Sequence, residues 1–160
     1  MKPLKILAAL TFCSLLLSLN TACTHHGFVT GSRKSVSGSW YEGAAGYDRA
    51  WPEWKESKAP ALVYFYTDWC RYCREFEHEL LSSSEVKDYL QNVVKIRINP
   101  EAGNKDNEVA KMFGVTGYPS IFIIPSGATK PKRLSQHKKM GGEWVLMSPA
   151  EFVQACRANE

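Results

Sequence analysis

The chain has 160 residues, of which 44% are hydrophobic and 12% aromatic, so it can bury the core of one compact domain and still carry an extension. The formal net charge is only +4 and the basic residues are scattered, which argues against nucleic acid as a partner. Five cysteines are too few for a scaffold built from disulfides, so they point to individual roles.

Residues 1–22 have the features of a bacterial signal peptide. Two lysines precede an apolar stretch from Ile6 to Leu19, which is shorter than the roughly 20 residues that cross a membrane. The sequence that ends at Cys23 resembles a lipobox, although Asn20 stands where a leucine is usual. We therefore expect Cys23 to be lipidated and to become the new N-terminus. Cleavage by ordinary signal peptidase, giving a soluble secreted form, is the alternative.

Residues 23–46 are rich in Gly and Ser and show no sustained apolar period, which predicts a flexible tether in front of a domain that covers residues 47–160. Both cleavage routes place the mature protein outside the cytoplasm, on the periplasmic side, with a lipid anchor as the membrane attachment. Thr24 is not the aspartate that retains bacterial lipoproteins in the inner membrane, which favours the outer membrane.

The domain is predicted to alternate helices and strands. In chain order, we expect a helix over 48–58 that restarts at Pro52, a strand over 61–66, helices over 70–81 and 84–90, a strand over 93–98, a helix over 104–113, a strand over 120–125, a basic edge strand within 132–140, and a helix from Ser148 to about 158. The strands over 61–66 and 120–125 are apolar without alternation, so we expect them to be buried on both faces. This order indicates a layered α/β domain.

The sequence Trp69-Cys70-Arg71-Tyr72-Cys73 directly follows a buried strand and opens a helix. Cysteines at i and i+3 on a first helical turn can form a disulfide. The free N–H groups and the dipole at the helix N-terminus favour a thiolate at Cys70, and Arg71 adds a cation beside it. These features predict that Cys70 is a nucleophile towards disulfides and that Cys73 is the resolving thiol.

Other interpretations of the two cysteines have less support. A zinc site needs four ligands, and Cys156 is the only further cysteine downstream. Haem attachment needs a histidine at position 74, which is an arginine, and a structural disulfide across so small a loop stabilises little. We therefore expect no metal and no cofactor. Cys156 is expected to be a buried small hydrophobe, with a regulatory or intermolecular thiol as the alternative.

Glu77 lies on the otherwise apolar arc of the predicted helix that also contains Cys73, Phe76 and Leu80. From that position it could exchange a proton with Cys73. The alternative is a glutamate at the margin of the apolar stripe, with its carboxylate in water.

The sequence Gly117-Tyr118-Pro119-Ser120 precedes the second fully buried strand. Together with the strand, the cysteine motif and the helix, it makes the stretch from Ala61 to Pro125 resemble the thioredoxin superfamily. The resemblance implies a thioredoxin-like fold, with a central mixed sheet of four to five strands flanked by helices. It also implies that Pro119 is cis and faces the cysteines, and that Trp69 and the backbone of Tyr118 bind a polypeptide as an added strand.

Within the superfamily, the stretch from Tyr66 to Glu77 most resembles the C-terminal, periplasm-facing domain of the transmembrane thiol:disulfide interchange reductase, and related secreted thioredoxin-like lipoproteins. Protein thiols and disulfides would then be the substrates, a membrane protein the electron donor, and the chain a monomer. Tyr64 stands where thioredoxins commonly carry a buried aspartate, so the role of that residue could have passed to Glu77, to Asp68 or to no residue.

The resemblance favours a reductase or isomerase. Arg71 and Tyr72, which help to set the redox potential, are neither the Gly-Pro of reducing thioredoxins nor the Pro-His of strong oxidants. An oxidase that donates its disulfide is therefore one alternative, and a binding module that uses the Tyr118 groove without catalysis is another.

Overall fold

The computed structural model describes residues 36–160. The expected signal peptide, the lipidation site Cys23 and most of the predicted tether lie outside the described residues. The elements are β1 (Tyr41–Glu42), α1 (Gly43–Ser57), β2 (Ala61–Phe65), α2 (Arg71–Glu75), the π-helical segment η1 (Phe76–Leu81), α3 (Ser84–Leu90), β3 (Val94–Ile98), α4 (Asn104–Met112), β4 (Ser120–Ile124), β5 (Lys132–Leu134), β6 (His137–Met140), β7 (Glu143–Leu146) and α5 (Pro149–Arg157).

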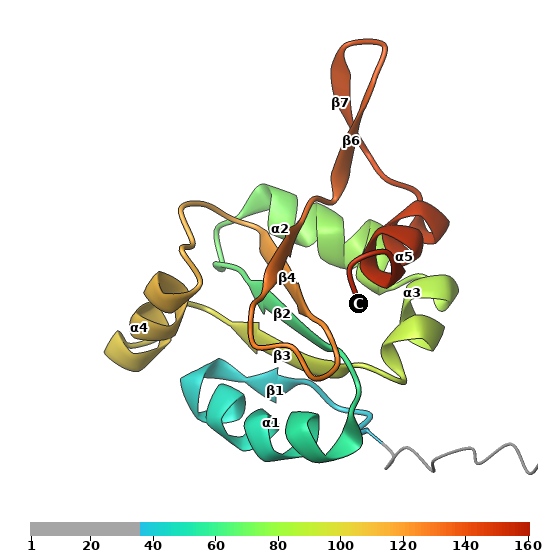
Figure 1. Cartoon of the computed structure of the whole chain (residues 1–160). Coiled ribbons are helices and arrows are strands. Elements are labelled where there is room, and N and C mark those ends of the chain that lie inside the picture. Colours follow the sequence, from blue (N-terminus) through green and yellow to red (C-terminus); the bar gives the residue numbers. More distant parts are fainter. Residues whose placement is uncertain (1–35) are drawn as a thin grey trace, which may run out of the picture. The chain divides into compact units, whose positions relative to one another are not determined.

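The main sheet has five strands in the order β1-β3-β2-β4-β5. The strands β1, β3 and β2 run parallel, whereas β4 and β5 are antiparallel to their neighbours, so the sheet is mixed. Helices cover both of its faces (Figure 1). The predicted thioredoxin-like fold, a mixed sheet of four to five strands flanked by helices, is thereby confirmed.

Two apolar layers explain why β2 and β4 lack alternation. Side chains on one face, such as Tyr64 and Ile121, pack with Phe76 of η1 and Phe152 of α5. Side chains on the other face pack with α1 and α4. Every residue of β2 and β4 is buried, as the continuous apolar runs predicted.

Capping residues lie at several helix ends where the sequence predicted them. Ser83 caps α3 by accepting from the Val86 N–H, and Ser148 caps α5 by accepting from the Glu151 N–H. Gly114 follows α4 with a positive φ of 65°, the conformation that favours glycine after a helix.

The folded part begins earlier than the predicted boundary at residue 47, because β1 and the first turn of α1 occupy residues 41–46. The glycines there have specific positions. Gly43 has a φ of +64°, and a Cβ on Gly46 would lie 2.7 Å from the backbone carbonyl carbon of Tyr41. Pro52 lies inside α1 and does not start a helix, contrary to the sequence prediction.

The basic stretch 132–140 is not one strand. Its first part is β5, which pairs with β4 at the edge of the main sheet. Its second part is β6, which pairs with β7 as a separate antiparallel hairpin. Gly141 and Gly142, with φ of 61° and 93°, make the turn between them. Within residues 36–160, none of the helices combines the length and the hydropathy that a membrane span needs.

Candidate active site

The backbone places Cys70 at the amino end of α2. β2 ends at Phe65, and the Cys70 N–H donates to the carbonyl of Thr67 at 3.1 Å in the turn that follows. Cys70 is the N-cap residue of α2, and its Sγ accepts from the Cys73 N–H at 3.0 Å. A negative charge on this sulfur would therefore meet a backbone donor and the positive end of the helix.

A disulfide joins Cys70 to Cys73, and the two Cα atoms are 5.2 Å apart. The residues are 3% and 2% exposed, so little of either reaches solvent. Their neighbours differ, because Trp69 is 65% exposed and Tyr72 is 58% exposed. The pair is therefore a nearly buried disulfide between two protruding aromatic side chains.

The register of β4 on β2 brings the Pro119 loop to this site. Ser120, the first residue of β4, pairs with Phe65, the last residue of β2, because the strands are antiparallel. The loop before β4 and the loop after β2 consequently lie at the same end of the sheet. The Tyr118–Pro119 peptide bond is cis, as the resemblance implied.

Tyr118 and Trp69 contact each other at this end of the sheet. Their rings meet edge to face with centroids 6.1 Å apart, and Tyr118 also packs against the apolar layer that contains both cysteines. The Trp69 indole N–H donates to the two carboxylate oxygens of Glu101 at 3.1 and 3.0 Å. Sequence reasoning did not find Glu101, which holds an exposed tryptophan in one orientation.

Glu77 is half-buried, and its Oε1 accepts a hydrogen bond from the Tyr64 hydroxyl at 3.1 Å. Tyr64 is fully buried in the layer that contains Cys73, and its ring lies 5.2 Å from that of Phe76. Burial, and then the carboxylate of Glu77, raise the pKa of Tyr64, so this hydroxyl keeps its proton and acts as a donor. Tyr64 and Glu77 thus form one polar pair, and Tyr64 shares its apolar layer with Cys73.

The other residues considered from the sequence are more exposed. Asp68 is exposed, and its backbone carbonyl accepts from the Arg74 guanidinium at 3.0 Å. Arg71 is exposed on the first turn of α2. Tyr72 meets the ring of His137 edge to face at 6.4 Å, a contact that the sequence did not predict.

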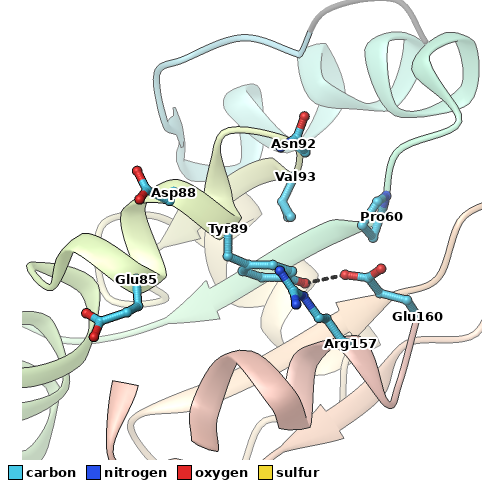
Figure 2. A pocket seen from close by; sticks show the side chains of 8 residues that line it. All are labelled: Pro60, Glu85, Asp88, Tyr89, Asn92, Val93, Arg157 and Glu160. Carbon is cyan, nitrogen blue, oxygen red and sulfur yellow. Dashed lines mark hydrogen bonds between the residues drawn. The ribbon is translucent and has the colours of Figure 1, made fainter. Parts of the chain in front are cut away.

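A separate cavity of about 500 Å³ is lined by eight residues, none of them a cysteine (Figure 2). Its lining includes Pro60 and Val93, which directly precede the parallel strands β2 and β3. The cavity therefore lies at the amino ends of these strands, whereas Cys70 follows the carboxyl end of β2. In it the Tyr89 hydroxyl donates to Glu160 at 2.6 Å.

The third described cysteine, Cys156, is fully buried on α5. Burial raises the pKa of its thiol to about 12, which keeps it protonated at neutral pH. Over residues 36–160 there is no cluster of three or more His, Cys, Asp or Glu side chains that could hold a metal ion.

A family model described as thioredoxin-like matches residues 40–126. Protein disulfide isomerase-like 2-2 of Oryza sativa subsp. japonica is 30% identical over 145 residues, which are 89% of this chain and 33% of the relative. Thiol:disulfide interchange protein DsbD of Salmonella typhi is 35% identical over 75 residues, 46% of this chain and 13% of the relative. The chain thus spans a third or less of the length of these curated relatives.

Solved structures show the same fold. The C-terminal domain of Neisseria meningitidis DsbD in the oxidised form matches with a TM-score of 0.57 and 21% identity, covering 73% of this chain and 95% of that domain. A thioredoxin from Thermus thermophilus matches with a TM-score of 0.54 and 21% identity, covering 74% of this chain and 84% of the other.

Proposed function

The chain belongs to the thioredoxin-like family and carries the cysteine pair of a thiol–disulfide oxidoreductase of that type, and from this premise we propose that it reduces or isomerises protein disulfides outside the cytoplasm. The observation that carries the proposal is the Cys70–Cys73 disulfide, placed at the amino end of α2 and beside the loop of Pro119. In this proposal Cys70 is the attacking sulfur, Cys73 is the resolving sulfur, and the loop of Pro119 binds the substrate polypeptide.

The reaction starts from the reduced pair. The Cys70 thiolate attacks one sulfur of a substrate disulfide, that disulfide breaks, and its other sulfur leaves as a thiolate that takes up a proton. Cys73 then loses its proton and attacks the Cys70 sulfur, which releases the second substrate thiol. Two electrons pass to the substrate, and the pair ends as the disulfide found in the structure.

Trp69, Tyr118 and Pro119 form the substrate-binding edge in this proposal. The start of β4 adjoins the end of β2, so an extended polypeptide that pairs with the Tyr118 backbone would run past Cys70. The exposed ring of Trp69, oriented by Glu101, adds an apolar surface there.

Glu77 would receive the proton that Cys73 loses in the second step. It lies on η1, which continues the helix that contains Cys73, and its carboxylate accepts a hydrogen bond from the Tyr64 hydroxyl at 3.1 Å. The pair would take the place of the buried aspartate that thioredoxins carry at the position of Tyr64. Arg71 and Tyr72 would tune the redox potential, since both lie between Cys70 and Cys73 in the sequence.

The signal-like residues 1–22 and the lipobox-like sequence at Cys23 support export and a lipid anchor, with the outer membrane favoured. Because the pair is left oxidised after each reduction, the protein needs a reductant outside the cytoplasm, for which we propose a membrane electron donor. We propose a monomer that contacts the membrane through its lipid alone.

The decisive experiment traps the reaction halfway. In the variant Cys73→Ala, the mixed disulfide between Cys70 and the substrate cannot be resolved, so we expect exported proteins to remain covalently attached and to be released by dithiothreitol. The matched control, Cys70→Ser with Cys73→Ala, should trap nothing. Trapping that is equal in both variants would contradict the proposed role of Cys70.

The direction of electron flow is tested by equilibrating the pair with glutathione buffers. A reductase or isomerase should have a potential between that of thioredoxin, about −270 mV, and that of disulfide isomerase, about −180 mV. The hydrogen bond to Cys70 Sγ also suits an oxidase, because stabilising the thiolate makes the disulfide more oxidising. A potential near −120 mV would establish that alternative instead.

A further inference from the structure

The hairpin of β6 and β7 has no part in the main sheet, and it projects from the body of the domain (Figure 1). Its strands pair only with each other, over four residues each. Two large apolar side chains nevertheless occur on it in exposed positions, with Met140 at 61% and Trp144 at 64%. Exposed side chains of this kind stabilise the fold little, so another role should account for them.

The two faces of the hairpin have different surroundings. Residues that are directly opposite share a face, so His137, Lys139, Trp144 and Leu146 lie on one face and Lys138, Met140, Glu143 and Val145 on the other. The second face meets α5, where Lys138 forms an ion pair with Glu151.

The first face meets the cysteine motif. His137 contacts the ring of Tyr72, and these two residues line a hollow of about 370 Å³ together with Ser135 and Trp144. Tyr72 lies between Cys70 and Cys73 in the sequence, so the hollow adjoins the cysteine motif through this side chain. It is open, because Tyr72 and Trp144 are both more than half exposed.

The chain before the hairpin turn is basic. Residues 130–142 contain five Lys or Arg residues and no Asp or Glu, and Glu143, which follows the turn, lies on the face away from the hollow. Lys138 is neutralised by Glu151 on the other face, whereas the Lys139 ammonium lies 5.4 Å from the centroid of the Trp144 ring on the face of the hollow. An apolar hollow with an adjacent cation complements an apolar side chain that has carboxylates next to it.

We propose that Tyr72, His137, Lys139 and Trp144, here called the hairpin surface, bind an acidic segment of the substrate protein next to the cysteine that Cys70 attacks. The inference rests on the proposed function and adds a class of substrate to it. An apolar side chain of the segment fills the hollow, and its carboxylates face Lys139. Insertion of the hairpin into a membrane fits less well, because Met140 and Trp144 lie on opposite faces.

The test compares three substrates of the reduced protein. The first is a peptide whose single disulfide is flanked by a leucine and several glutamates, the second replaces the glutamates by lysines, and the third is hydroxyethyl disulfide, which has no segment to bind. We expect the wild type to reduce the acidic peptide about tenfold faster than the basic one, with a difference that decreases as salt is added.

The variants locate this preference. Trp144→Ala should slow reduction of the acidic peptide about fivefold to tenfold, and Lys139→Gln about threefold. Met140→Ala is the matched control, because it removes an equally exposed apolar side chain from the opposite face, and it should change nothing. Hydroxyethyl disulfide should react equally fast with all of these proteins, which also shows that the variants are folded.

Equal rates for the two peptides would overturn the proposal, as would equal effects of Trp144→Ala and Met140→Ala. Binding to anionic phospholipid vesicles that Trp144→Ala abolishes, with unchanged peptide rates, would assign the hairpin to a membrane instead. The two proposals fail differently. A wild type that is inert towards hydroxyethyl disulfide contradicts the proposed function, whereas an active protein without peptide preference contradicts the hairpin surface alone.

Discussion

Cys70 and Cys156 are both almost completely buried, yet their surroundings assign them opposite chemistry. Cys70 caps the amino end of α2, where a backbone N–H points at its sulfur. Cys156 lies in the last turn of α5, near the end of the helix dipole that disfavours a negative charge. Burial raises the pKa of its thiol to about 12, and the hydrogen bond with Tyr89 offsets only part of this rise. Since the two cysteines are similarly buried, the helix end and not the exposure would make Cys70 the more reactive of the two.

The largest expected effect comes from substituting Cys70 and Cys156 in separate variants. Cys70→Ser should lower the rate of disulfide reduction at least about a thousandfold, because a hydroxyl at this position is not ionised at neutral pH. Cys156→Ala should keep the wild-type rate and should lower the free energy of unfolding by about 1–2 kcal/mol, because it leaves a small cavity. Insulin reduction and urea unfolding measure the two quantities. A loss of activity in Cys156→Ala that exceeds its loss of folded protein would show that Cys156 takes part in the reaction.

The second prediction concerns the polar pair beside Cys73. Glu77→Gln should slow the release of substrate from the mixed disulfide about tenfold at pH 7, because the carboxylate can no longer take the proton of Cys73. Tyr64→Phe keeps the carboxylate and removes only its hydrogen bond, so the rate should fall about twofold to threefold and stability by about 1 kcal/mol. Stopped-flow measurements across pH 5 to 9 resolve this step.

Glu79→Gln is the control for this step, because Glu79 lies on the same segment η1 and is exposed. It should leave both the rate and its pH profile unchanged. The role of Glu77 would be refuted if the Glu77→Gln and Glu79→Gln variants had the same profile as the wild type.

The smallest effect tests the ion pair that Glu151, in the first turn of α5, forms with Lys138. The ion pair with Lys138, and then the hydrogen bonds with Ser148, lower the pKa of Glu151 to about 2. A lowered pKa in the folded state means that this carboxylate stabilises the protein above its ordinary pKa near 4.5, and that the contribution is lost as the pH falls towards 2. The difference in melting temperature between the wild type and Glu151→Gln should therefore be present at pH 6 and shrink from pH 4.5 downwards. A difference that stays constant over this range would contradict the ion pair.

Features specified by neighbouring residues were predictable from the sequence. Ser148 followed by Pro149, and the cysteine motif after a buried strand, were recognised because each signal lies within a few residues. The layered α/β class followed from the order of such signals, whereas the thioredoxin-like fold was implied by the family resemblance of residues 61–125. Gly43 and Gly46 were misassigned to a flexible tether, because composition alone does not show that a glycine has a positive φ or a close contact with Tyr41.

The candidate site was predictable only in part, for a related reason. Cys70, Cys73 and Pro119 were found through their motifs, whereas the hydrogen bond from Tyr64 to Glu77 and the contact of Tyr72 with His137 join distant parts of the chain. One signal was present and not used. Gly141-Gly142 is typical of a two-residue hairpin turn and would have predicted that β6 pairs with the residues after the turn, which form β7.

The buried Lys95 determines where the chain that leads from Cys23 joins the folded domain. It is 5% exposed, and its ammonium donates to the carbonyls of Ser37 and Leu90 at 3.0 Å each. This fastens the start of the described chain near the amino end of β3, whereas Cys70 follows the carboxyl end of the parallel strand β2. Even fully extended, the chain from Cys23 to Ser37 spans at most about 50 Å. A molecule anchored through Cys23 would thus keep Ser37 within about 50 Å of the membrane surface, and this attachment would be at the end of the sheet opposite to Cys70.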